Sequence, residues 1–145
     1  MRVMAIDFGD VRTGVVVSDE SATLAGEAWV ISEKNPVNAA RTIAAEATGR
    51  GVSLIVVGYP RNMNGTAGPR AEKSEQLAEN IRKQCDVEVV LWDERMTTMS
   101  AHRILADSGK FGKKRKKTVD AVAASLILES YLAHLKTMSK GENPQ

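Results

Sequence analysis

Hydrophobic residues in the first part of the chain fall into three short runs that polar residues separate. The runs cover residues 2–8, 13–18 and 24–31, and each has the length and the apolar content of a β-strand. Because only a few residues connect one run to the next, we predict that these strands form an antiparallel meander.

Helical spacing begins after Asn35, which can cap a helix that has Pro36 at its first position. Gly51 predicts the end of this helix. A continuous apolar run at 53–58 follows, and its lack of alternation predicts a strand that is buried on both faces. The inner face of the helix is predicted to consist of Val37, Ala40, Ile43, Ala44 and Ala47.

The rest of the chain continues this alternation of helix and strand. A second helix is predicted at 69–84 and a fifth strand at 87–92. A third helix follows at 98–108, and Thr118 then caps a last helix. This last helix is apolar on most of its circumference, so we expect it to be well buried.

This order of elements predicts an α/β fold with a mixed five-stranded sheet, in which three antiparallel strands precede two parallel ones and helices flank the sheet. Right-handed crossovers place the fourth and fifth strands parallel to the first, on the side of it away from the second and third. We expect one domain at residues 1–136 and a flexible tail at 137–145.

Composition narrows the class of protein. The 145 residues are 43% hydrophobic and 26% charged, as in an ordinary soluble domain. We see no apolar run long enough to cross a membrane, and the chain opens without the features of a secretory signal. The single cysteine, Cys85, cannot form an internal disulfide, so we expect a reducing, cytoplasmic location.

The net charge of +2 conceals an uneven distribution. Six basic residues lie within 110–117, and setting them apart leaves the rest of the chain at about −4. Such a segment is typical of proteins that contact polyanions, but it can equally be a solvated loop. The segment itself does not decide between the two.

Acidic residues follow two of the predicted parallel strands. Asp7 ends the first, and Asp93 and Glu94 follow the fifth. Carboxyl ends of parallel strands meet at one edge of a sheet, where ligands bind. Asp120, at the start of the last helix, can reach the same edge. Each residue also has a simpler role, because Asp93 or Glu94 can pair with Arg95 and Asp120 can merely begin a helix.

Crowded carboxylates repel one another unless cations are bound between them. Oxygen ligands of this kind suit Mg²⁺ or Mn²⁺. Two such ions, about 3.5–4 Å apart, activate water and stabilise the leaving oxygen when a phosphodiester is cleaved. The three acidic positions together therefore favour a metal-dependent nuclease site.

Four motifs carry a resemblance to a known family: "DFGDVRTGVVVSD", "VVGYPRNMNGTAGPRAEK", "WDERMTT" and "KKRKKTVDAVAASLIL". In this order they resemble the YqgF family of Holliday-junction-resolvase-like proteins and pre-16S rRNA nucleases, over about residues 2–135. The resemblance implies an RNase H-like fold and a nuclease that matures the 5′ end of 16S rRNA in ribosome biogenesis. It also implies that Asp7, Glu94 and Asp120 are the catalytic, metal-binding residues.

Other residues of these motifs are candidates for binding nucleic acid. Arg61 and Asn62 lie in a glycine-rich loop and can donate to phosphate oxygens, although the loop can also be a simple turn. Arg12 and Arg95 flank the acidic positions. The basic segment adds Lys113, Lys114, Arg115, Lys116 and Lys117.

Three alternatives remain open on the sequence. "DFGDVRTG" fits the D-x-G-x-x-x-x-G phosphate motif of actin-like ATPases, which however clamp nucleotide between two lobes. The protein can also be a non-catalytic module that binds RNA or a ribosomal partner. Within the nuclease class, the substrate can be branched DNA, as for a Holliday-junction resolvase, in place of pre-rRNA.

Overall fold

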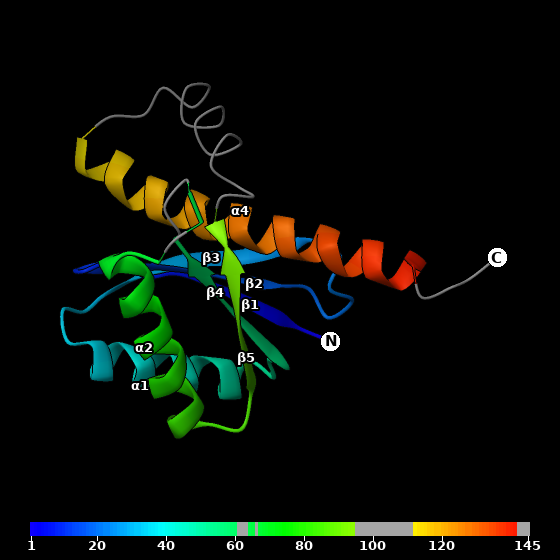
Figure 1. Ribbon diagram of the computed structural model, residues 1–145, viewed down its shortest axis with the longest axis horizontal. Coiled ribbons are helices and arrows are strands. Elements are labelled where there is room, and N and C mark those ends of the chain that lie inside the picture. Colours follow the sequence, from blue (N-terminus) through cyan, green and yellow to red (C-terminus); the bar gives the residue numbers. More distant parts are fainter. Residues whose placement is uncertain (61–63, 66, 95–111, 142–145) are drawn as a thin grey trace.

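The computed structural model describes residues 1–60, 64–65, 67–94 and 112–141, the last range with its backbone alone at 112–120 and 139–141 (Figure 1). In these ranges no helix is both long and apolar enough to span a bilayer. The helix predicted at 98–108 lies outside the described residues.

A five-stranded mixed sheet has the order β3-β2-β1-β4-β5. β1 pairs antiparallel with β2 and parallel with β4, and β5 continues the parallel part. The predicted fold class and strand arrangement are thus confirmed. The strands are β1 (Val3–Asp7), β2 (Arg12–Ser18), β3 (Ala25–Ser32), β4 (Leu54–Tyr59) and β5 (Glu88–Asp93).

Helices cover both faces of this sheet (Figure 1). α1 (Pro36–Gly49) and α2 (Pro69–Gln84) lie on one face, and α4 (Gly112–Gly141) crosses the other. Asn35 caps α1 as predicted, since its Oδ1 accepts hydrogen bonds from the backbone N–H groups of Val37 and Asn38. The predicted bounds of α2 agree with the structure.

The start of the last helix was predicted wrongly. α4 begins at Gly112, so the basic residues at 113–117 belong to the helix and Thr118 is not its cap. Lysine and arginine are good helix formers, and repulsion between like charges one turn apart costs only a few tenths of a kcal/mol per pair. α4 also continues to Gly141, past the boundary expected at residue 136.

Side chains of β1 alternate between two hydrophobic cores. Met4 and Ile6 pack with α1 and α2, whereas Val3 and Ala5 pack with α4. Every residue from Val3 to Ile6 is fully buried. The central parallel strands are therefore covered on both faces, which explains their unbroken apolar runs.

One prediction about the inner face of α1 was wrong. Val37 is 46% exposed, and Ala39 is buried in addition to the other predicted positions. Val37 lies in the first turn, beside the capped end of the helix, while the buried stripe is centred on Ala40 and Ala44. A pattern based on large side chains overlooks an alanine that packs closely.

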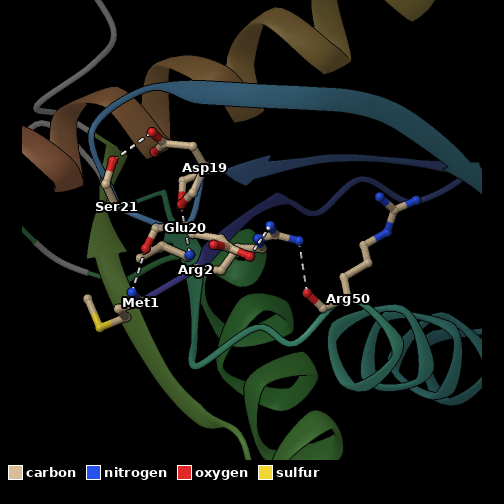
Figure 2. Close-up of polar contacts among 8 residues, drawn as sticks. Met1, Arg2, Asp19, Glu20, Ser21 and Arg50 are labelled. Atoms are coloured by element: carbon tan, nitrogen blue, oxygen red, sulfur yellow. Dashed lines mark hydrogen bonds and ion pairs between the residues drawn. The ribbon is translucent and has the colours of Figure 1, made fainter.

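The end of the sheet opposite the carboxyl ends of β1 and β4 is fastened by polar contacts (Figure 2). Arg2 donates to the carbonyl oxygen of Arg50 at 3.1 Å and pairs with Glu20 at 3.3 Å. The Asp19 carboxylate accepts hydrogen bonds from the Ser21 hydroxyl and from the backbone N–H groups of Thr23 and Leu24. These bonds lower the pKa of Asp19 to about 2. The polar side chains at this end of the sheet thus bond to neighbouring segments of the chain and stabilise the connections there.

Candidate active site

The carboxyl ends of β1, β4 and β5 bring two of the predicted acidic residues to one edge of the sheet. Ile6 is level with Val57 in the parallel register, so the next residue, Asp7, lies beside Gly58. Gly58 is in turn level with Trp92 of β5, and Glu94 follows two residues later. Asp7 and Glu94 therefore flank Gly58 from opposite sides.

Gly58 forms a notch between these carboxylates. A Cβ atom built on it would lie 3.0 Å from Glu94 Oε2 and 2.7 Å from Ile127 Cδ1 of α4. Both distances are shorter than an ordinary van der Waals contact, so a side chain at this position would collide with Glu94. The absence of a side chain at residue 58 is what lets the Glu94 carboxylate lie over the strand.

The surroundings of Glu94 disfavour the negative charge of its carboxylate. Burial raises its pKa, the positive charge of Arg70 opposes this shift, and the charge of Asp93 adds to it. A buried carboxylate next to another acid favours either a proton or a bound cation. Its environment is thus one in which a metal ion would be stabilising.

Asp120 belongs to α4, the helix that packs over the notch. Ile127 of the same helix contacts the position of Gly58, and Asp120 precedes it by seven residues, or two helical turns. This spacing puts both residues on the same side of the helix. The side chain of Asp120 lies outside the described residues, so its role stays a prediction.

The described residues fit an oxygen-ligand metal site only in part. Among them, no group of three His, Cys, Asp or Glu is placed to hold a metal ion. Asp7 and Glu94 supply two carboxylates at the edge beside Gly58, and Asp120 is the third candidate. Carboxylate oxygens alone are the donor set that Mg²⁺ and Mn²⁺ prefer.

The predicted nucleic-acid-binding residues are mostly beyond the described part of the chain. Arg61, Asn62 and Arg95 lie outside it, as do the side chains of 113–117. Arg12 is the first residue of β2, and the turn before it is tight, because a Cβ at Gly9 would lie 2.3 Å from the Arg12 carbonyl oxygen. Its role also stays a prediction.

Sequence reasoning missed a cation at this edge. Arg70, in the first turn of α2, donates to the carbonyl oxygen of Phe8 at 3.4 Å, directly after Asp7. Three residues later, Lys73 pairs with Asp10 at 2.9 Å. Both residues stand in the quoted motif "GTAGPRAEK", but only the crossover from β4 to α2 brings them to the turn between β1 and β2.

The raised pKa of Glu94 leads to a prediction about stability. Because the pKa of Glu94 is raised in the folded state, ionising this side chain costs folding free energy. The cost is absent below the ordinary glutamate pKa of about 4.3 and grows as the pH rises through the folded-state pKa. We expect Glu94→Gln to raise the unfolding free energy of metal-free protein at pH 7 and to lose this gain near pH 4. Urea titrations in EDTA at both pH values measure it.

The exposed Glu129 of α4 provides the matched control. Glu129→Gln makes the same chemical change away from the notch, and we expect no gain at either pH. A gain from Glu94→Gln that is equal at pH 4 and pH 7 would rule out the electrostatic explanation.

Comparison with known proteins gives a consistent result. Residues 1–134 match the RuvX family, described as "Holliday junction resolvase". A "Putative pre-16S rRNA nuclease" of Geobacillus thermodenitrificans is 45% identical over 134 residues, which cover 91% of this chain and 97% of that protein. One of the same name from Halothermothrix orenii is 42% identical over 132 residues, covering 91% and 94%.

Solved structures with a similar fold include two that hold Holliday junctions. A fowlpox virus resolvase in complex with Holliday junction DNA has a TM-score of 0.61 at 12% identity, covering 93% of this chain and 99% of that one. RuvC of T. thermophilus with its junction substrate has a TM-score of 0.60 at 15% identity, covering 94% and 97%. At such low identity the likeness concerns the RNase H-like fold alone. On the match of residues 1–134 and its 41–45% identical relatives, the chain belongs to the RuvX family, also called YqgF.

Proposed function

We propose that the protein is a metal-dependent endonuclease that hydrolyses phosphodiesters of structured nucleic acid, with the 5′ end of pre-16S rRNA as its substrate during ribosome biogenesis. The observation that carries this proposal is the placement of Asp7 and Glu94 on either side of the Gly58 notch. Relatives over 40% identical across nearly their whole length bear the name "Putative pre-16S rRNA nuclease", which supports the choice of substrate.

Asp7, Glu94 and Asp120 would hold Mg²⁺ or Mn²⁺ in this proposal. When bound as a pair, such ions would activate water and neutralise charge on the phosphodiester. The chain's own contribution is to position the carboxylates: Asp7 ends β1, Glu94 directly follows β5, and the lack of a side chain at Gly58 makes room for the Glu94 carboxylate. Burial of Glu94 means that water screens its carboxylate less, which would strengthen its attraction for a bound cation.

Basic and amide side chains would position the nucleic-acid backbone across this edge. We assign this role to Arg12 beside the turn, to the loop residues Arg61 and Asn62, and to Arg95 next to Glu94. The helical start of α4 supplies the rest of the proposed surface, namely Lys113, Lys114, Arg115, Lys116 and Lys117.

A second substrate is favoured by a specific finding. The RuvX family carries the description "Holliday junction resolvase", and both structural neighbours described above were solved with Holliday junctions. Processing of rRNA and resolution of a DNA junction both require hydrolysis of a phosphodiester at the same kind of site. Branched DNA is therefore the alternative to pre-rRNA.

The experiment that tests the proposal compares three substrates of equal length: a pre-16S rRNA fragment, a four-way DNA junction and single-stranded RNA. We expect cleavage of the rRNA fragment with Mg²⁺ or Mn²⁺ and none in EDTA. Preferred cleavage of the junction would transfer the assignment to a resolvase. Binding without cleavage of any of the three would favour a non-catalytic RNA-binding module.

The basic start of α4 gives a prediction on binding. If four of its lysines contact phosphates, replacing them should reduce the slope of log affinity against log salt by up to about 3.6 on duplex. Affinity should fall by a similar factor for all sequences, since lysines at phosphates read charge and not bases. Fluorescence anisotropy at several salt concentrations measures this. The variant replaces Lys113, Lys114, Lys116 and Lys117 with Ala.

A control variant removes the same number of charges elsewhere. All four control positions are exposed and away from the start of α4. We expect this variant to retain most of the salt dependence, and equal slopes for the two variants would show that the basic segment makes no special contact. The control replaces Lys34, Arg41, Lys83 and Lys136 with Ala.

A further inference from the structure

Arg70 is one of two cations, with Lys73, that α2 brings to the turn between β1 and β2 and that the sequence did not predict. It stands in the first turn of α2, and α2 follows β4 in the crossover that begins at the edge beside Gly58. Its guanidinium reaches the carbonyl oxygen of Phe8, next to Asp7. Its charge also acts on Glu94 and on Asp10. Arg70 therefore contacts the chain directly after Asp7, and its charge acts on Glu94.

The guanidinium has capacity to spare. Its hydrogen bond to Phe8 is long, at 3.4 Å, and uses one Nη2 donor of the five N–H donors that an arginine has. The residue is exposed, so its remaining donors can reach a ligand. A planar fork of this kind binds two phosphate oxygens at once.

Lys73, on the same helix, differs from Arg70 because its charge is paired with a carboxylate. Its ammonium pairs with Asp10 at 2.9 Å, and this pair tethers the turn between β1 and β2 to α2. Arg70 adds only a weak bond to the same turn. Lys73 therefore makes the stronger of the two contacts between α2 and the turn. Holding the turn does not by itself account for a second cation, Arg70, at this position.

We propose that Arg70 is a substrate-positioning residue whose guanidinium binds a non-bridging phosphate oxygen next to the Asp7 and Glu94 carboxylates. The inference rests on the proposed nuclease function and adds to it a specific phosphate contact from α2. The long hydrogen bond to Phe8 uses one Nη2 donor at this edge and leaves the Nε and Nη1 donors to bind a phosphate.

The test measures cleavage and binding for Arg70→Ala and Arg70→Lys. We expect Arg70→Ala to lower kcat by about 100-fold or more, as when a preorganised donor to a reacting oxygen is lost. Arg70→Lys should recover part of the rate, because it keeps the charge and loses the fork. Binding is measured in EDTA with a labelled four-way DNA junction and a labelled RNA stem-loop. The salt slope should fall by about 0.9 for Arg70→Ala, as for one phosphate contact.

Lys73→Gln is the matched control, since it loosens the same turn from the same helix. We expect its kcat to stay within about twofold of the parent protein and its salt slope to be nearly unchanged. If Lys73→Gln lowers kcat as much as Arg70→Ala, then Arg70 serves only to hold the turn and the proposal is wrong. An unchanged salt slope and an unchanged kcat for Arg70→Ala would also overturn it.

Two further outcomes separate this inference from the proposed function. If Asp7→Asn still cleaves, the nuclease assignment fails, while the salt slopes in EDTA still test the phosphate contact. If Asp7→Asn is inactive and Arg70→Ala behaves like the parent protein, the inference alone fails. A slope change confined to RNA or to the junction supports the contact and identifies which nucleic acid makes it.

Discussion

Asp7→Asn should reduce phosphodiester hydrolysis by at least about 100-fold while leaving the fold intact. Asparagine keeps the shape of aspartate, but it removes a negative charge that a metal site of carboxylates needs. Because Asp7 ends β1 at the edge where the proposed site gathers carboxylates, we also expect loss of its charge to relieve repulsion in the metal-free state. The melting temperature in EDTA should therefore hold or rise. Single-turnover cleavage assays and thermal melts of the purified variant provide both measurements.

Asp10→Asn makes the same chemical change three residues later, in the turn that follows β1. Asp10 is exposed and paired with Lys73, so we expect its loss to change cleavage by no more than about twofold. Equal activity of Asp7→Asn and the parent protein would point to a contaminating nuclease or to a different site.

Gly58→Ala should have an effect of similar size by a steric route. The added Cβ would meet Glu94 Oε2 at 3.0 Å and Ile127 Cδ1 at 2.7 Å, so the Glu94 carboxylate and the end of the buried Ile127 side chain must move. Overpacking of this kind costs about 1–3 kcal/mol of stability. Displacing Glu94 from its position should also weaken Mn²⁺ binding and lower cleavage by about 100-fold, because an error of 1 Å in a catalytic group has effects of that order.

Gly49→Ala is the natural control, because Gly49 lies in α1 and a Cβ there meets nothing within 4 Å. In a helix, alanine is favoured over glycine by about 0.5–1 kcal/mol, so this variant should be slightly more stable and fully active. Urea unfolding, Mn²⁺ titration calorimetry and cleavage rates compare the two. Mn²⁺ affinity and cleavage that survive in Gly58→Ala would show that the notch does not shape the site.

Local patterns were enough to predict most of the fold. The strand order followed from short connections and right-handed crossovers, and the helix at Pro69–Gln84 was predicted from its proline and its apolar spacing. The position of Asp7 at a carboxyl end also followed from this topology. These features depend on the nearest residues and on general rules of chain connection, so a single sequence contains them.

Features that depend on tertiary packing were not predicted. The start of α4 at Gly112 was missed because a run of like charges resembles a loop, although its residues favour a helix. Arg70 was missed because only the fold brings it close to the residue after Asp7 and within reach of the charge of Glu94. The notch at Gly58 needs the position of Glu94 and Ile127, which come from β5 and α4.

The central claim is that Asp7, Glu94 and Asp120 hold divalent metal at the carboxyl end of β1. Crystals grown or soaked in Mn²⁺ test it most directly, because anomalous scattering locates manganese without reference to activity. The claim predicts an anomalous peak within about 2.5 Å of an Asp7 carboxylate oxygen and of at least one oxygen from Glu94 or Asp120. A structure that places the Asp120 carboxylate at the opposite edge of the sheet, with no peak at Asp7, would contradict it.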